Sequence, residues 1–264
     1  MKNKNIVLIT MILLSGLFSD CDKPNSSLSG TRSTCLTPNL QNDIVAFYPF
    51  SAGSINDFSG NNNHLVNTTS ASPGADRNGN DSCAFNFISA NGDYLKFDNP
   101  TFIDNIQVSS FSISLWYKPI GIRSYGKYEL LIGRDSTLHC PDTYGQWSVG
   151  LFDCRRAVFG INEFSIWDNY VNSNGCNYTM SDLSDSWQHL AVTCNGTSLK
   201  MYRNGILTTL PAGTGCNTVQ PTINTGTFFL GKEYTGLLDD IIIYKKILSQ
   251  SEINQLYNLQ PCCE

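Results

Sequence analysis

Residues 236–257 read GLLDDIIIYKKILSQSEINQLY and join a short apolar segment to a capped turn of helix. Positions 241–244 (IIIY) are too few and too rich in isoleucine for a helix, so they predict a buried strand. Ser249 and Glu252 have the spacing of a capping box, in which a hydroxyl and a carboxylate satisfy the free amides at a helix start.

Two adjacent carboxylates, Asp239 and Asp240, enter this strand. They repel each other unless a cation or hydrogen-bond donors lie nearby. The charges alone favour two interpretations equally: a bound cation, or two carboxylates solvated at a loop edge. Because successive strand residues alternate, Asp240 is expected to face away from Asp239.

The rest of the chain has the composition of an antiparallel β protein. Asn-Gly pairs stand at 78–79, 91–92, 195–196 and 204–205. Asn-Gly between alternating segments is the strongest short hairpin signal, because type I′ turns need positive φ at two residues. Helical character is confined to the turn after Ser249, so the pattern predicts a sandwich rather than a βαβ fold.

Five segments follow one another in the chain: IVAFYPF (44–50) with NDFSGNNNH (56–64), AFNF (84–87) with NGDYL (91–95), FSISLWYK (111–118), WQHLAVT (187–193) with LKMYRNG (199–205), and the C-terminal segment quoted above. In this order they resemble the LamG-like domains, jelly rolls of the concanavalin A-like lectin/glucanase superfamily. The resemblance covers most of residues 41–258. It implies one all-β domain, an antiparallel two-sheet jelly-roll sandwich, and it does not specify a ligand.

The N-terminal region has the pattern of an exported protein. Residues 1–20 have a basic start and an apolar run too short for a stable membrane anchor, which predicts an export signal. Cys21 follows directly, and the arrangement resembles a bacterial lipoprotein acylated at Cys21, although Asp20 stands where a small residue is usual. Residues 21–40 predict a tether, 41–258 the domain and 259–264 a tail. We expect a lipid-anchored protein of the bacterial outer membrane or cell surface, or a secreted protein.

Ten cysteines in an exported chain predict disulfides. Cys194 and Cys216 flank a strand pair that they could join. Because the first and last strands are neighbours in the implied fold, the C-terminal pair Cys262-Cys263 is expected to bond Cys35 or Cys83.

The loop around Asp57 is dense in oxygen donors, and calcium prefers six to eight oxygen ligands. The resemblance implies a structural calcium where the first loop meets the last strand. Asp57 and Asp239 match the ligand positions there, and the carbonyl of Gly92 is expected to contribute. The alternative is an Asx turn, in which Asp57 caps its own loop amides and binds no metal.

Motifs for catalysis are missing from the sequence. His189 lies in an alternating segment without a nucleophile or acid placed by any motif, so we expect a structural role for it. No glutamate has a carboxylate two residues on, the spacing that retaining glycosidases of this architecture use. We therefore expect no enzymatic activity. Glu129 or Glu163 within about 6 Å of another carboxylate in a cleft would instead favour a glycoside hydrolase.

The variable stretch 121–181 is where we expect the ligand site, because loops carry function on a fixed scaffold. The predicted patch consists of Trp167, Asp168, Asn169, Tyr170 and Trp147, since exposed aromatics beside polar groups suit sugars. The alternative is that both tryptophans fill the space between the sheets. The partner expected is a glycan, or otherwise a cell-surface protein bound by an adhesin. A net charge of -5 argues against nucleic acid.

Overall fold

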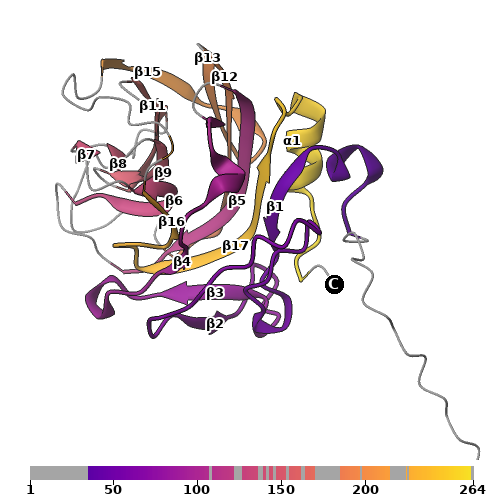
Figure 1. Ribbon diagram of the computed structural model, residues 1–264, viewed down its shortest axis with the longest axis vertical. Coiled ribbons are helices and arrows are strands. Elements are labelled where there is room, and N and C mark those ends of the chain that lie inside the picture. Colours follow the sequence, from indigo (N-terminus) through magenta and orange to yellow (C-terminus); the bar gives the residue numbers. More distant parts are fainter. Residues whose placement is uncertain are drawn as a thin grey trace, which may run out of the picture.

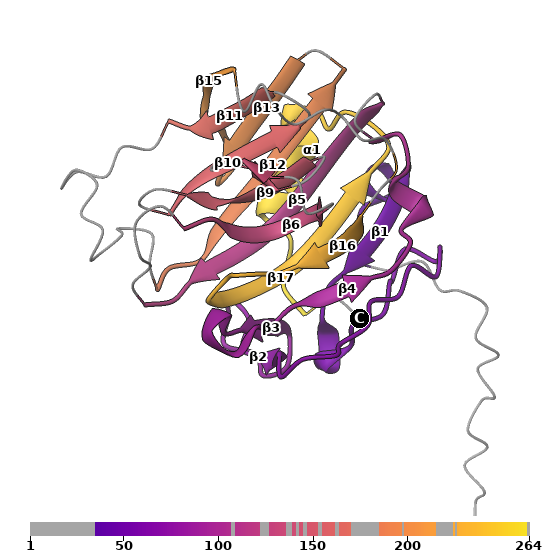
Figure 2. The same cartoon turned by 60° about the vertical axis from the view of Figure 1, so that its left-hand side comes forward.

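Two antiparallel sheets pack face to face (Figures 1 and 2). The computed structural model describes residues 35–106, 109–121, 127–135, 139–140, 143–144, 147–152, 155–161, 164–169, 185–196, 198–214, 224 and 226–262. Predictions for residues 1–20, Cys21, Glu163, Tyr170 and Cys216 fall outside these ranges. No helix in the described part of the chain is long and apolar enough to cross a membrane.

Sheet A has the order β14-β13-β12-β5-β17-β3-β2, and β1 also pairs with β17. Its strands are β1 (Ile44–Tyr48), β2 (Ser72–Gly74), β3 (Ala84–Phe87), β5 (Ser110–Pro119), β12 (Gln188–Asn195), β13 (Ser198–Arg203), β14 (Ile206–Leu207) and β17 (Gly236–Tyr244).

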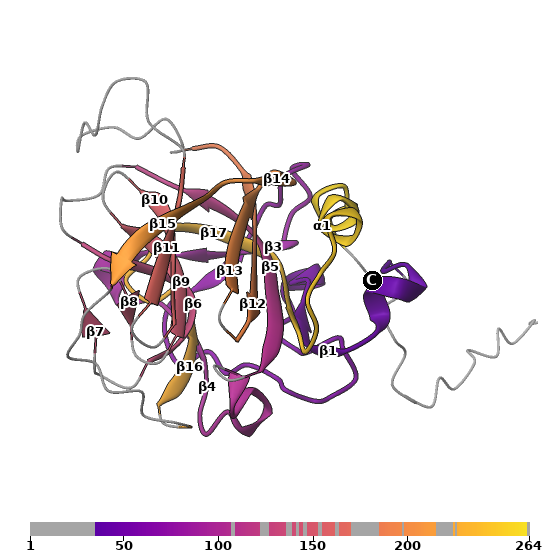
Figure 3. The same cartoon turned by 90° about the horizontal axis from the view of Figure 1, so that it is seen from above.

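Sheet B has the order β15-β11-β10-β9-β6-β16-β4. Its strands are β4 (Leu95–Phe97), β6 (Glu129–Asp135), β9 (Trp147–Phe152), β10 (Arg156–Ile161), β11 (Phe164–Asp168), β15 (Thr209–Thr214) and β16 (Thr227–Leu230). A short hairpin of β7 (His139–Cys140) and β8 (Thr143–Tyr144) lies on the face of sheet B turned away from sheet A, where β8 is close to β6, β9 and β10 (Figures 1 and 3). The predicted antiparallel sandwich is confirmed.

The predicted C-terminal strand is β17, which pairs with β1, β3 and β5. Ile241 and Ile243 belong to the core between the sheets, whereas Ile242 and Tyr244 pack in a second core on the other side of sheet A. Both faces of this stretch are therefore buried, which is why its residues form a continuous apolar run and do not alternate with polar ones.

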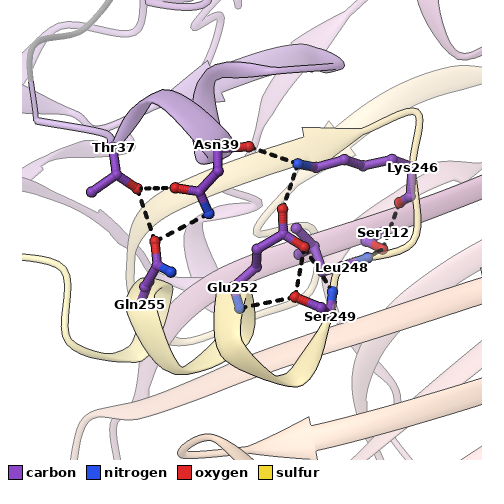
Figure 4. Close-up of polar contacts among 8 residues, drawn as sticks. All are labelled: Thr37, Asn39, Ser112, Lys246, Leu248, Ser249, Glu252 and Gln255. Atoms are coloured by element: carbon purple, nitrogen blue, oxygen red, sulfur yellow. Dashed lines mark hydrogen bonds and ion pairs between the residues drawn. The ribbon is translucent and has the colours of Figure 1, made fainter.

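The single helix of the described chain, α1 (Gln250–Tyr257), covers the outer side of sheet A (Figure 3). Its capping box is formed as predicted: the Ser249 amide donates to the Glu252 carboxylate at 2.8 Å, and the Glu252 amide donates to the Ser249 hydroxyl at 3.3 Å. The Lys246 ammonium links Glu252 at 2.7 Å to the Asn39 carbonyl at 2.8 Å (Figure 4).

The described residues include part of the stretch predicted as a tether. The 3₁₀ turn η1 (Pro38–Gln41) lies against α1, and Leu36 and Leu40 are buried in the second core. Three further 3₁₀ turns, η2 (Ser51–Gly53), η3 (Ser89–Asn91) and η4 (Thr101–Ile103), lie in described loops. The packed domain therefore starts before residue 41.

The C-terminal end is covalently fixed to the residue that precedes β3. Cys262 forms a disulfide with Cys83, as the sequence predicted, and Cys35 is disulfide-bonded as well. Cys194 is instead a buried free thiol, which contradicts its predicted pairing with Cys216. Its side chain faces the core between the sheets, where it packs as a small apolar group.

Candidate functional site

Sheet B has one face turned away from sheet A, which we call the outer face (Figure 2). A small apolar cluster lies on this face. Leu130, Gly150, Val158 and Trp167 occupy matching positions on β6, β9, β10 and β11. Their strand neighbours point into the core between the sheets, so this row points outward. Phe152, Trp167 and Phe229 are the partly exposed members of the cluster.

Trp167 is the centre of the first half of this face. The guanidinium carbon of Arg156 lies 4.9 Å from the centre of the Trp167 ring, and the Phe152 ring meets it edge-on at 6.0 Å. Among the described residues, Arg156 Nε is a buried donor without a hydrogen-bond acceptor. An aromatic ring with a guanidinium over it suits a polar ligand that also has an apolar face.

A second aromatic pair lies on the same face at β16. The Phe229 ring meets Tyr94 edge-on at 5.2 Å, and the Lys232 ammonium lies 4.7 Å from the Phe229 ring centre. Between the two halves, the Tyr128 ring lies over Gly150, where an added Cβ would stand 2.5 Å from it. The Tyr128 and Ser148 hydroxyls lie 2.9 Å apart. The face thus combines aromatic rings, hydroxyls and two cations.

The structure splits the predicted patch. Trp167 faces outward, but Asp168 is fully buried and pairs with the Arg203 guanidinium at 3.1 Å. Trp147 is fully buried among Phe111 and Phe228 between the sheets, so it cannot contact a ligand. These two predictions are corrected: strand alternation turns Asp168 inward, and Trp147 fills the core.

Asn169 is exposed at the end of β11. Three further residues of this face, Arg156, Phe152 and Phe229, come from other strands and were not predicted from the sequence. The short apolar run at 157–161 was a usable signal for Arg156, since it predicts a strand, and alternation along a strand places Arg156 and Val158 on one face. The contact with Trp167 depends on the pairing of β10 with β11.

The Asp57 loop forms the Asx-type alternative to a calcium site. One carboxylate oxygen accepts from the amides of Phe47 and Ser59, both at 2.9 Å. The other accepts from the Ser59 hydroxyl at 2.8 Å and the Asn63 amide at 3.0 Å. Four donors directed at two oxygens satisfy this buried carboxylate and leave its lone pairs unavailable to a metal.

The other two predicted calcium ligands lie in separate networks. Asp239 accepts from Arg77 Nη1 at 2.7 Å and from the Asp240 amide at 2.7 Å. Gly92 closes the η3 turn, donating to Ser89. The arrangement of Asp57, Asp239 and Gly92 therefore does not fit one shared calcium ion.

Glu129 is held in a buried ion pair. Its carboxylate accepts from Arg155 Nε at 2.9 Å and Arg155 Nη2 at 3.1 Å, and both side chains are almost fully buried. This bidentate partner satisfies the carboxylate, so Glu129 is not one of a pair of carboxylates sharing an open cleft.

His189 is buried behind α1, against the rings of Trp116 and Tyr257. Its Nε2 lies 2.9 Å from the Ser114 hydroxyl, a geometry that would suit a nucleophile and base if either group reached solvent. Both are buried, and burial together with the charge of Arg77 lowers the pKa of His189 to about 3. The imidazole is thus neutral in the folded protein.

We expect His189 to weaken the fold in acid. The pKa of His189 is near 6.5 in the unfolded chain and about 3 in the folded chain, so between these values only the unfolded chain binds the proton. The free energy of unfolding therefore falls as the pH decreases through this range. Chemical denaturation at pH 7, 6, 5 and 4 should show that His189→Gln loses about 1.4 kcal/mol less per pH unit than the unmodified protein. Parallel curves for the two proteins would contradict this assignment.

Residues 89–254 match the family Laminin_G_3, the concanavalin A-like lectin/glucanases superfamily. The chain belongs to this family. An α-L-arabinofuranosidase from Bifidobacterium longum is 23% identical over 181 residues, which cover 64% of this chain and 16% of that protein.

Solved structures resemble this LamG-like domain in fold. The binding domain of Paraclostridial Mosquitocidal Protein 1 matches with a TM-score of 0.60 at 21% identity, over 83% of this chain and 52% of that one. The binding domain of botulinum neurotoxin DC, in complex with rat synaptotagmin II, matches with a TM-score of 0.61 at 18% identity, over 83% of this chain and 52% of that chain. Domain 4 of AbnA, an extracellular arabinanase from Geobacillus stearothermophilus, was solved in complex with arabinotriose. It matches with a TM-score of 0.53 at 19% identity, over 83% of this chain and 98% of that chain.

This LamG-like domain therefore spans about half of the two toxin chains, a smaller part of the arabinofuranosidase and nearly all of the AbnA domain. At these identities the structures establish the fold alone.

Proposed function

We propose that this LamG-like domain is a non-enzymatic module that binds carbohydrate on the outer face of sheet B, over Trp167. The observation that carries the proposal is the partly exposed Trp167 ring with the Arg156 guanidinium against it. A planar ring covers the C–H face of a sugar at little entropic cost, while a guanidinium donates to its oxygens.

The structural neighbours support a glycan as the partner. One is a domain in complex with arabinotriose, and another belongs to a neurotoxin whose cell entry depends on two ganglioside molecules. A protein partner is the second candidate, favoured by the neighbour bound to synaptotagmin II. The outer face supports the glycan first, because its rings lie beside cations and hydroxyls and do not form one flat apolar patch.

Two cations on this face favour an acidic glycan. Arg156 and Lys232 each lie against an aromatic ring, although the whole chain carries a net charge of -5. A carboxylate or sulfate group would accept from the Arg156 guanidinium in a charge-assisted hydrogen bond, which is stronger than a neutral one.

The proposal includes a surface location and no catalysis. The apolar N-terminal run and Cys21 support export and a lipid anchor, which would hold the domain at the bacterial surface. The bidentate contact of Glu129 with Arg155 supports a binding role over hydrolysis.

We expect Trp167→Ala to weaken binding of the best glycan at least about 30-fold, since a central aromatic anchor contributes about 2 kcal/mol or more. A glycan array that includes arabinotriose and sialylated ganglioside oligosaccharides would identify the probe, and titration calorimetry would measure its Kd. Arg156→Gln should weaken an acidic glycan and leave a neutral one nearly unchanged.

The matched control is Ile206→Ser on β14, in the other sheet, where the side chain is 68% exposed. This variant should bind like the unmodified protein. Equal affinity of Trp167→Ala and Ile206→Ser for the same glycan would contradict the proposed site. An array with no binding to any glycan would contradict the glycan proposal and favour a protein partner.

A further inference from the structure

The two carboxylates of β17 lie at an irregularity in the strand. The register with β5 shifts between Asp239 and Ile242, and Asp240 has φ +44°. The usual alternation is interrupted there, as in a β-bulge, so both carboxylates reach the same cation. The expectation that Asp240 faces away from Asp239 is therefore wrong.

That cation is Arg77. Its Nη1 lies 2.7 Å from Asp239 Oδ2, and its Nη2 lies 2.8 Å from Asp240 Oδ2. Nη2 also donates to the Leu259 carbonyl at 2.5 Å, and the guanidinium carbon lies 4.5 Å from the centre of the Trp116 ring. Arg77 therefore has oxygen partners on one side and an aromatic ring against its plane.

The partners of Arg77 are the kind of ligands that a divalent cation takes. Two carboxylate oxygens and a backbone carbonyl converge on the guanidinium, and hard cations such as calcium are held by these groups. Asp240 is 2% exposed, and its Oδ1 has no hydrogen-bond partner among the described residues. One more oxygen is thus available within this cluster.

The buried carboxylates of β17 need a nearby cation. Asp239 and Asp240 are 0% and 2% exposed, and burial raises the pKa of both; the charge of Arg77 lowers it, whereas that of buried Asp76 raises it further. Asp76 has its own donors, namely the amides of Asn78 and Asn80 and the Asn80 side chain. Arg77 is therefore the cation that compensates the β17 pair, and buried carboxylates without one are strongly unfavourable.

We propose that Arg77 takes the place of a metal ion in this protein, so that its fold does not depend on calcium, and that removing the guanidinium opens a divalent-cation site between Asp239, Asp240 and the Leu259 carbonyl. An open pocket of about 330 Å³, lined by Arg77, Trp116, Tyr257 and residues 258–261, gives solvent access to this position. The C-terminal segment is part of the site, because Leu259 supplies the carbonyl and Cys262 is bonded to Cys83.

The test is thermal unfolding of the oxidised full chain in EDTA and in millimolar calcium. The unmodified protein should have the same midpoint in both. Arg77→Met should lower the midpoint in EDTA by about 10 °C, and calcium should restore about half of the loss or more. Arg77→Lys keeps the charge and should lose less.

Asp240→Asn in the Arg77→Met background removes one of the two facing charges, so this double variant should unfold above the single variant in EDTA. This comparison also covers the case in which Arg77→Met does not fold alone. A calcium-dependent midpoint in the unmodified protein would overturn the proposal. The proposal would also be overturned if neither calcium nor Asp240→Asn raised the unfolding midpoint of Arg77→Met.

Discussion

Replacing Arg155 with methionine is expected to lower the free energy of unfolding by about 3–5 kcal/mol. The substitution leaves the Glu129 carboxylate, which is 1% exposed, without its bidentate partner. Burying an uncompensated charge costs much more than the net contribution of the pair itself. Urea denaturation at pH 7 would measure the loss.

The control for this prediction is the double variant Glu129→Gln/Arg155→Met. It removes the charge along with its partner, so it should recover much of the lost stability. If both variants were equally unstable, the loss would come from the packing of the Arg155 side chain and its hydrogen bond to the Gly121 carbonyl, not from the stranded carboxylate.

Removing the Cys83–Cys262 disulfide is expected to cost about 5 kcal/mol. The two cysteines are 179 residues apart, and the chain-entropy model assigns a large gain to a crosslink that closes so long a loop. The variant Cys83→Ala/Cys262→Ala avoids a new free thiol. Urea denaturation under oxidising conditions would keep the other disulfides intact.

Cys194→Ala is the matched control, since it removes a buried cysteine that has no disulfide partner. It should cost about 1 kcal/mol, the effect of a small cavity. If the double variant lost no more than this control, the C-terminus would be held by α1 and the contact of Arg77 with Leu259, and the crosslink would add little.

The candidate ligand face belongs to sheet B and the Arg77 cluster to sheet A, so the experiments on the two are independent of each other. Loss of glycan binding in Trp167→Ala concerns the outer face of sheet B, whereas the calcium response of Arg77→Met concerns the far side of sheet A. If the protein binds glycan over Trp167, and Arg77 takes the place of the metal, binding should proceed equally well in EDTA.

Sequence alone determined the features that depend on neighbouring residues. The IIIY run predicted a buried strand, and in the structure β17 has one core on each side. The Ser249 and Glu252 spacing predicted a capping box that the structure contains. Both signals are short-range, because side-chain periodicity and capping act within a few residues.

Only the tertiary structure decided which distant groups meet. Asp239 forms an ion pair with Arg77, which lies 162 residues earlier in the chain. The local sequence around either residue does not predict this contact. Likewise, Trp147 and Trp167 are both tryptophans of one variable stretch, yet one fills the core and the other faces outward. Sheet order and register set these outcomes, since they determine which face of a strand is buried and which charges are brought together.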